Sequence, residues 1–213
     1  LFIFMKFLSH QLTFPDVSES SEDGLLAVGG DLSSERLLLA YSKGIFPWFG
    51  EGDPILWWSP DPRFVLLPKN LKVSKSMKQI MKKQKFSFTT NKAFEAVVKH
   101  CSTINREKQG QFDTWITDDI ITAYTNLHQL GYAISVEVWE NNDLVGGLYG
   151  LNLKNGVFCG ESMFSKVSNA SKAGFIYLIQ NNNFKLIDCQ IRTKHLESLG
   201  GAYISRAKFL SYL

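Results

Sequence analysis

Two acidic residues inside apolar segments are the first candidates for chemistry in this sequence of 213 residues. Glu161 lies in the segment FCGESMF (158–164), and Asp188 lies in the segment LIDCQ (186–190). Burying a carboxylate is unfavourable unless a hydrogen bond or an opposite charge compensates it. Each acid therefore needs a compensating partner, either within the protein or on a bound ligand.

The LIDCQ segment predicts a strand on which Asp188 and Gln190 share one face, because alternate residues of a strand point the same way. The pair places a carboxylate beside an amide group that both donates and accepts hydrogen bonds. Such a pair can orient an amine or relay a proton. The alternative is an edge strand whose side chains only bind nearby loops, and the residue types alone favour this structural interpretation.

Glu161 allows the same two interpretations. On its predicted strand it shares a face with Cys159 and Met163. A purely structural Glu161 would pair with a buried base such as Lys172 or Arg192. A functional Glu161 would line a pocket, where burial raises the pKa of its carboxyl group and makes a cationic substrate group its natural partner. A second acid on a neighbouring strand would strengthen that preference.

Cys189 is a third candidate, because a thiol close to Asp188 and His195 could act as a nucleophile. The predicted alternation places Cys189 on the strand face opposite Asp188, and a free cysteine is usually a small core residue. A cysteine hydrolase is therefore disfavoured. The four histidines show no spacing typical of metal ligands, so we expect no metal site.

The composition is that of an ordinary globular chain, with 45% hydrophobic and 20% charged residues. The formal net charge is only +3, so binding of nucleic acid would need a local basic patch. The three cysteines lie far apart without a CxxC pair, which argues against a disulfide framework and favours the reducing cytoplasm. Neither a signal peptide nor a membrane span is indicated, so we expect a cytoplasmic protein without a membrane partner.

Periodicity and capping residues predict the elements that must position these side chains. Helices are expected at 33–44, 74–84, 91–101 and 118–129, with N-caps at Ser33, Ser74, Asn91 and Thr117. Strands joined by tight turns are expected at 133–139, 144–153 and 157–164. They are followed by a helix at 169–180, a strand at 185–190 and a short helix at 194–199. The order predicts an α+β fold with a small N-terminal α/β domain (1–65) and a main domain (66–213).

Basic and aromatic residues suggest a possible nucleic-acid surface. The segment 62–94 contains no acidic residue but contains Arg63 and eight lysines. It is either a solvated helix face or the footprint of a phosphate backbone, and the residues alone give the two interpretations equal weight. Trp48 and Trp115 lie in the loop-like segments FPWFG and FDTWIT, where either indole could stack on a base.

Taken together, these segments resemble one family closely, the bacterial leucyl/phenylalanyl-tRNA–protein transferases. The resemblance runs in order and nearly without gaps from about Phe14 to the C-terminus. The blocks WWSPDPR, GESMF and IDCQ are highly specific in combination. The remaining matches are GLLAVGGDLS, RLLLAYSKGIFPWF, TWIT, SVEVW, LVGGLYG, NASK, and SLG followed by Arg206.

The resemblance implies an aminoacyltransferase that takes Leu or Phe, and less well Met, from aminoacyl-tRNA. It would join this residue to a protein whose N-terminal residue is Arg or Lys, without the ribosome, and so mark the protein for N-degron proteolysis. No cofactor or metal is implied, because the aminoacyl ester already carries the activation. The family resemblance further implies a main domain similar to GNAT acyltransferases, and we expect a monomer.

Matching motifs assign roles to the polar candidates. Asp188 matches a catalytic residue that polarises Gln190, whose side-chain carbonyl then helps to remove a proton from the attacking α-amine. An alternative view makes the pair mainly positional, with the substrate assisting its own proton transfer. Glu161 matches the acid that interacts with the amine or the basic side chain of the acceptor.

The matches around the donor fall into three groups. Trp48 and Trp115 match the aromatic residues that, in the family, lie beside the terminal adenosine and the aminoacyl group. Phe158, Met163 and Ile187 match the apolar residues that, in the family, form the pocket for the donor side chain. The basic cluster for the tRNA acceptor stem overlaps Lys82, Lys83 and Lys85.

Two other classes of function are alternatives at this point. An acyl-CoA N-acyltransferase would use a glycine-rich turn at the start of the helix after the meander, and the segment SKVSNASKAG has no glycine before Ala173. A non-enzymatic adaptor for basic N-termini would use Glu161 and Asp188, but it would need neither Gln190 nor a basic patch.

Overall fold

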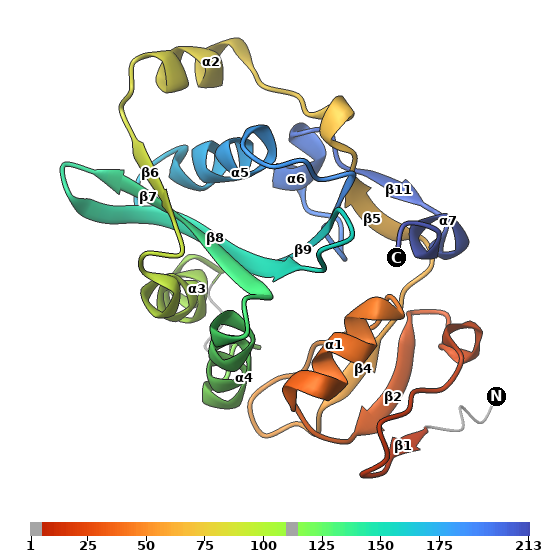
Figure 1. Ribbon diagram of the computed structural model, residues 1–213. Coiled ribbons are helices and arrows are strands. Elements are labelled where there is room, and N and C mark those ends of the chain that lie inside the picture. Colours follow the sequence, from red (N-terminus) through yellow and green to blue (C-terminus); the bar gives the residue numbers. More distant parts are fainter. Residues whose placement is uncertain (1–5, 110–114) are drawn as a thin grey trace.

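The computed structural model describes residues 6–109 and 115–213, which form two β-sheets with helices around them (Figure 1). The smaller sheet has the strand order β1-β2-β4-β3. Its elements are β1 (Phe7–Leu8), the 3-10 helix η1 (Val17–Glu19), β2 (Leu25–Gly29), α1 (Ser34–Ser42), β3 (Phe46–Pro47) and β4 (Leu56–Trp58).

The larger sheet has the strand order β11-β5-β10-β9-β8-β7-β6. Its strands are β5 (Arg63–Leu66), β6 (Ser87–Thr90), β7 (Ala133–Glu140), β8 (Asp143–Asn152), β9 (Val157–Ser165), β10 (Leu186–Asp188) and β11 (Ala202–Ile204). The helices of this part are η2 (Pro68–Asn70), α2 (Lys75–Lys82), α3 (Phe94–Gln109), α4 (Asp118–Gln129), α5 (Ala170–Gln180), α6 (Lys194–Ser198) and α7 (Arg206–Leu210). The predicted α+β class is thereby confirmed.

Helices cover both faces of the larger sheet, and each face has its own hydrophobic core. Helix α5 lies on one face, where Ala173 and Ile176 pack with Val136 and Leu148. Helices α3 and α4 lie on the other face (Figure 1). The central strands β8 and β9 are therefore enclosed between two helical layers.

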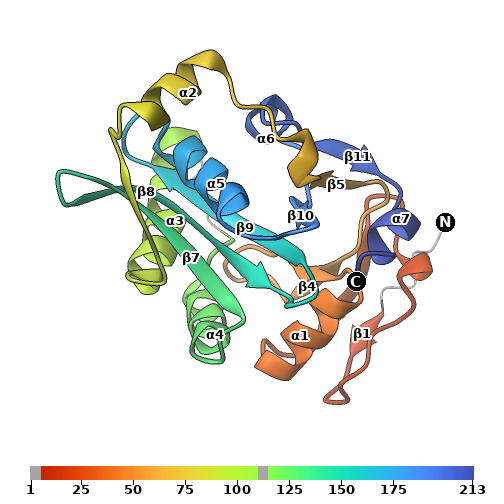
Figure 2. The same cartoon turned by 45° about the horizontal axis from the view of Figure 1, so that its top comes forward.

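The smaller sheet shares a core with the larger one. Leu37 and Tyr41 of α1 belong to the same buried cluster as Tyr124 of α4 and Phe209 of α7. Figures 1 and 2 both show α1 on the side of the larger sheet that carries α4. The N-terminal part is thus packed onto the same layer as α4, and it reaches toward β9.

The predicted meander, the helix after it and three of the four predicted caps are confirmed. The side chains of Ser33, Ser74 and Thr117 cap α1, α2 and α4. The cap at Asn91 is wrong, since α3 begins at Phe94. Asn91 instead has a φ of 59°, and its side-chain oxygen accepts a hydrogen bond of 2.9 Å from the backbone of Ser135. The side chain therefore serves the neighbouring strand and not the helix.

A β-bulge separates the two ends of β9. Tyr149 pairs with Ser162 and Gly150 pairs with Gly160, so Glu161 is an extra residue without a partner on β8. Bulges of this kind bend a strand and redirect the side chain at the bulge. The backbone is tightly packed here, because a Cβ atom on Gly150 would lie 2.1 Å from the carbonyl oxygen of Cys159.

This close approach predicts different effects of alanine at the two paired glycines. Gly150→Ala should lower the free energy of unfolding by about 2–4 kcal/mol, because the methyl group forces the two strands apart. Gly160→Ala should change it by less than about 1 kcal/mol, since its Cβ would meet its nearest atoms at 3.7 Å. Urea denaturation measures both values, and equal losses in the two variants would contradict the bulge geometry.

Candidate active site

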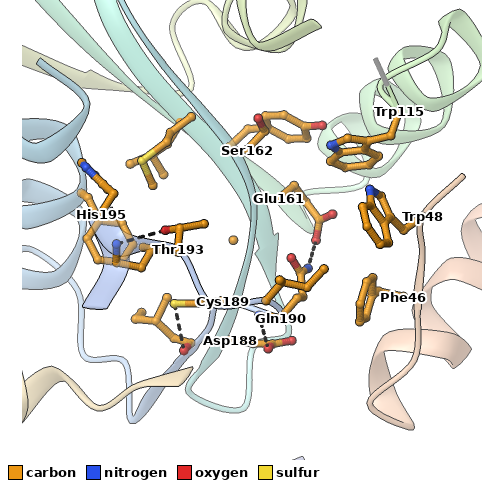
Figure 3. Close-up of a pocket in the computed structure, with 18 of the residues that line it drawn as sticks. Phe46, Trp48, Trp115, Glu161, Ser162, Asp188, Cys189, Gln190, Thr193 and His195 are labelled. Carbon is orange, nitrogen blue, oxygen red and sulfur yellow. Dashed lines mark hydrogen bonds between the residues drawn. The ribbon is translucent and has the colours of Figure 1, made fainter. Parts of the chain in front are cut away.

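A cavity of about 790 Å³ opens where β9 and β10 separate. The two strands are parallel neighbours, with Ile187 beside Phe158 and Asp188 beside Cys159. Beyond this pair β10 ends, whereas β9 continues to Ser165. The backbone therefore forms a wedge, and Figure 3 shows the side chains that line it.

Glu161 projects from the bulge into this wedge. Its Oε1 and Oε2 atoms lie 2.7 Å and 3.0 Å from the hydroxyl oxygens of Tyr41 and Tyr124, and Nε2 of Gln190 donates a hydrogen bond of 3.0 Å to Oε1. Burial raises the pKa of Glu161 to about 7, although hydrogen bonds donated to the ionised form of this carboxyl group would oppose the shift. The carboxyl group is thus partly protonated at neutral pH.

The basic partners expected for a structural Glu161 are not found. Arg192 forms its ion pair with Glu197, at 2.7 Å. Within residues 6–109 and 115–213, the ion pairs involve other carboxylates and not Glu161. Neutral hydroxyl and amide groups therefore hold this acid in place.

The bulge also changes which residues share a face of β9. Cys159 packs in the core on the α4 side, whereas Met163 packs against the core on the α5 side. The expectation that Cys159, Glu161 and Met163 share one face is therefore wrong. Simple alternation fails because the unpaired residue at the bulge shifts the period of the strand.

Asp188 is fully buried and forms an ion pair with Arg63 of β5. Nε and Nη2 of Arg63 donate to Oδ1 and Oδ2 of Asp188 at 2.8 Å and 2.7 Å. The guanidinium lies between the rings of Phe46 and Phe209, at 4.6 Å and 4.7 Å from their centroids. Burial disfavours the charge, yet the Asp188 carboxylate raises the pKa of Arg63 above its ordinary value. The guanidinium of Arg63 therefore keeps its charge in the core.

Gln190 is connected to Asp188 through its backbone. Its φ of 57° turns the chain away from β10, and its N–H donates a hydrogen bond of 3.0 Å to Oδ1 of Asp188. Its side-chain amide turns toward Glu161 instead. The predicted strand at 185–190 is therefore too long, and its alternation does not describe Gln190, because β10 ends at Asp188.

The apolar residues expected around the donor all line the cavity, namely Phe158, Met163 and Ile187. Phe158 and Ile187 are fully buried, and Met163 packs against the same core. Further apolar residues that the sequence did not single out line the cavity as well, namely Phe46, Phe49, Leu148, Phe175 and Leu196. An aromatic side chain, or an aliphatic one without a branch at Cβ, would find apolar contacts on this side.

Trp48 and Trp115 line the opposite side of the cavity, and Figure 3 shows both indoles across from His195. Trp48 is 42% exposed. The ring nitrogen of Trp58 donates a hydrogen bond of 2.7 Å to the backbone carbonyl of Trp48 and so fixes this loop. Trp115 is half-buried, and an exposed indole such as that of Trp48 beside an apolar cavity is suited to stacking against a flat ring.

Cys189 lines the cavity but is poorly suited to nucleophilic attack. Burial raises the pKa of its thiol, and the nearby Asp188 charge raises it further. In the described part of the chain, no cluster of His, Cys, Asp and Glu has the geometry to hold a metal ion. Glu161 and Gln190 are hydrogen-bonded polar groups that line the same cavity.

Lys82, Lys83 and Lys85 do not belong to the cavity lining. All three are exposed at the end of α2 or just beyond it, and Lys85 lies 3.5 Å from Glu140. The basic segment is less uniform than the sequence suggested, because Arg63 is buried and binds Asp188.

Among the helices of the described chain, none has the length and apolar character to span a membrane.

Three residues at the centre of the site were not predicted from the sequence. Tyr41 and Tyr124 lie within the helices expected at 33–44 and 118–129, where neither has an assigned role, and Arg63 belongs to the basic segment 62–94. The signal for Arg63 was its place directly before the apolar run FVLL, where a single charge must find a buried partner. The two tyrosines gave no comparable signal, since buried tyrosines are common.

Among solved structures, a protein of unknown function from Bacteroides thetaiotaomicron matches with a TM-score of 0.48 and 10% identity, over 71% of this chain and 55% of that chain. A GCN5-related N-acetyltransferase from Kribbella flavida matches with a TM-score of 0.38 and 9% identity, over 78% of this chain and 59% of that chain. Likenesses with TM-scores below 0.5 identify neither the fold nor the function.

The sequence comparisons are much closer. The family profile described as leucyl/phenylalanyl-tRNA protein transferase matches residues 65–213, and the profile of its N-terminal domain matches residues 30–61. A leucyl/phenylalanyl-tRNA–protein transferase from Christiangramia forsetii is 58% identical over 98% of this chain and 100% of its own length. Relatives of the same name from Flavobacterium psychrophilum and Syntrophus aciditrophicus are 56% and 53% identical, over 98% and 97% of this chain and 99% and 86% of their own lengths. The chain therefore belongs to the leucyl/phenylalanyl-tRNA–protein transferase family.

Proposed function

We propose that this enzyme transfers Leu or Phe from aminoacyl-tRNA to proteins whose N-terminal residue is Arg or Lys. The names of the relatives specify the donor and the kind of acceptor. One observation supports a basic acceptor residue: Glu161 is an acid in the cavity whose partners, Tyr41, Tyr124 and Gln190, are all neutral. A cationic N-terminal residue would supply the missing charge.

The apolar side of the cavity supports the donor preference. Phe158, Met163 and Ile187 can enclose an aromatic side chain or an aliphatic one without a branch at Cβ, and a methionine in the wall adapts to more than one shape. Met is therefore proposed as a third and weaker donor. A β-branched donor would fit less well, by about 1–3 kcal/mol for a misplaced methyl group.

The reaction would proceed by attack of the α-amine on the ester carbonyl of the donor. The new C–N bond forms while the C–O bond to the terminal ribose breaks, and the ribose oxygen takes up the proton that the amine loses. Gln190 donates through Nε2 to Glu161, so its amide oxygen is left to accept a hydrogen bond from the amine. Holding the amine in the attacking orientation lowers the barrier without a strong base.

In this scheme Asp188 is a positioning residue. Its carboxylate is shared between Arg63 and the backbone N–H of Gln190, and it is fully buried. A carboxylate held by a guanidinium is a weak base, because protonation would leave the buried cation unpaired. The positional view of the Asp188–Gln190 pair is therefore favoured over the proton relay.

We further propose that the product is marked for degradation through its new N-terminal residue, and that the enzyme acts as a monomer in the cytoplasm. The three cysteines are buried and unbridged, as expected for a reducing compartment.

The reaction is tested by incubating the purified protein with radiolabelled Leu-tRNA and a peptide that begins with Arg. Label should enter this peptide but not a matched peptide that begins with Ala. Label in the Ala peptide alone, or in neither peptide, would overturn the proposal. Binding of the Arg peptide without label transfer would identify an adaptor, and acylation of the peptide by acetyl-CoA would identify an acyl-CoA enzyme.

Two variants of Asp188 separate positioning from proton relay. Asp188→Ala should lower turnover by about 10²–10⁴-fold, because Gln190 loses its anchor. Asp188→Asn keeps an oxygen for the backbone N–H of Gln190, and it should retain clearly more turnover than the alanine variant. Equal losses in the two variants would support a relay that needs the negative charge. Turnover is compared only at temperatures where circular dichroism shows both variants folded, since each leaves Arg63 with a weaker partner.

The basic cluster is tested by the salt dependence of tRNA binding. Replacing Lys82, Lys83 and Lys85 by Gln should weaken binding and should flatten the slope of log affinity against log salt by about 2–3, because each phosphate that a lysine neutralises adds nearly one to that slope. Lys43→Gln is the control, since Lys43 is exposed at the end of α1, away from α2. An unchanged slope in the triple variant would exclude these lysines from the tRNA interface.

A further inference from the structure

Two phenol hydroxyl groups and one carboxyl group from distant parts of the chain form a triangle at the edge of the cavity. The hydroxyl oxygens of Tyr41 on α1 and Tyr124 on α4 lie 2.5 Å apart. Each also lies close to the Glu161 carboxyl group on β9, Tyr41 at 2.7 Å from Oε1 and Tyr124 at 3.0 Å from Oε2. All three sides of the triangle therefore have hydrogen-bond length.

Both phenol groups keep their protons. Tyr41 is 1% exposed and Tyr124 is 0% exposed. Burial raises the pKa of each phenol well above its ordinary value, and the nearby Glu161 charge raises both further. The two tyrosines thus bring two protons to the three contacts.

An ionised Glu161 would leave one side of the triangle without a hydrogen atom. Two phenolic protons can occupy only two contacts, so the lone pairs of two oxygen atoms would face each other across the third. A proton on Oε2 of Glu161 fills every side. Glu161 then donates to Tyr124, Tyr124 donates to Tyr41, and Tyr41 donates to Oε1 of Glu161, which still accepts from Gln190.

The surrounding groups favour this neutral form. The negative charge of Asp188 on β10 raises the pKa of Glu161, and Arg63 on β5 pairs with Asp188 and not with Glu161. Tyr149 on β8 and Cys159 on β9 are buried, and burial raises the pKa of both, so both remain neutral. The proton count agrees with the pKa of Glu161, which burial raises to about 7.

We propose that Tyr41 and Tyr124 are positioning residues of the transfer reaction: they hold one shared proton with Glu161 in the free enzyme, and Glu161 releases it when the cationic N-terminal residue of the acceptor binds. The inference rests on the proposed function, which makes Glu161 the partner of that cation. The proton passes from Oε2 to the solvent, and the carboxylate then pairs with the acceptor cation. Oε1 accepts from Gln190 in both states, so the amide keeps its orientation throughout.

The proton ring is tested first in the free enzyme, without any substrate. A carbon-13 label in the glutamate side chains, assigned with Glu161→Gln, lets NMR follow the titration of Glu161. In Tyr124→Phe the acidic proton loses its acceptor, so the pKa should fall by about one unit, the size of one buried hydrogen bond. If both phenols simply donated to a carboxylate, removal of one would raise the pKa, and that result would overturn the ring.

Tyr149→Phe is the matched control for this titration. Tyr149 is as deeply buried as Tyr124, but its hydroxyl oxygen has no hydrogen-bond partner in the described structure. Its replacement should leave the Glu161 titration unchanged, and a shift equal to that of Tyr124→Phe would overturn the special role of the ring. Tyr41→Phe is a second ring variant, to be used if Tyr124→Phe does not fold. It should also lower the pKa of Glu161. A wild-type pKa near the ordinary value of a glutamate would also overturn the proposal.

Proton release on binding is the second test. Calorimetric titration of the enzyme with an Arg-Ala peptide at about pH 6.5, in two buffers of different ionisation enthalpy, counts the protons released. Roughly three quarters of a proton should be released, which is the fraction bound at that pH for a pKa of about 7. Tyr124→Phe should release less, and the acidic limb of its KM profile for the acceptor should move to lower pH.

The outcomes separate this inference from the proposed function. If the Arg peptide accepts Leu from Leu-tRNA but no proton is released when it binds, the proton switch is wrong and the proposed transfer stands. If the peptide is not a substrate, the proposed function fails, and the acceptor cation is no longer the trigger for release.

Discussion

The buried ion pair between Arg63 and Asp188 is the interaction on which the rest of the site depends. A guanidinium and a carboxylate in a core are tolerated only when each satisfies the other with good geometry. Here the two parallel hydrogen bonds are 2.7 Å and 2.8 Å long. Arg63 also donates to the carbonyl oxygen of Gly44, at 3.3 Å, and its guanidinium lies between two aromatic rings. One residue thus ties the N-terminal sheet, the C-terminal helix and the strand of the site together.

The two acids of the site are stabilised in opposite ways, which explains how they can lie close together. Asp188 has a permanent cation, full burial and a backbone hydrogen bond to Gln190, so it belongs to the framework. Glu161 has only neutral neighbours and faces the cavity, so its charge can change with its ligand. Two ionised carboxylates without a cation would repel each other, and the pairing of Asp188 leaves Glu161 as the responsive one.

The sequence predicted the meander, the helix after it and most helix starts, because these depend on local patterns. The expected residues of the cavity wall came from the family resemblance instead. Caps such as Ser74 and Thr117 act within one turn, and the meander has a clear period of two. Alternation failed in β9 because the bulge at Glu161 depends on the pairing with Gly150, and pairing is not visible in one segment. Arg63 and Tyr124 were missed for a related reason. Their partners lie 125 and 37 residues away along the chain.

The sequence identifies the family, whereas the structure shows which contacts the residues of the cavity make. Specific blocks such as GESMF and IDCQ identified the family, whereas residue types alone favoured a structural interpretation of Asp188. The structure supports part of that interpretation, since Asp188 does serve a structural purpose beside the cavity. The resemblance assigned Gln190 and Glu161 to one site but paired Gln190 with Asp188. The hydrogen bond between the side chains of Gln190 and Glu161 appears only in the folded chain.

The separation of β9 from β10 has a consequence for how such an enzyme can evolve. The opening lies where one backbone stops pairing with another. Substitutions at wall positions such as Met163 or Leu148 would alter which donor fits, while the hydrogen-bonded frame keeps its width. Donor choice can thus drift between lineages by single side chains, with the machinery for amine attack inherited unchanged.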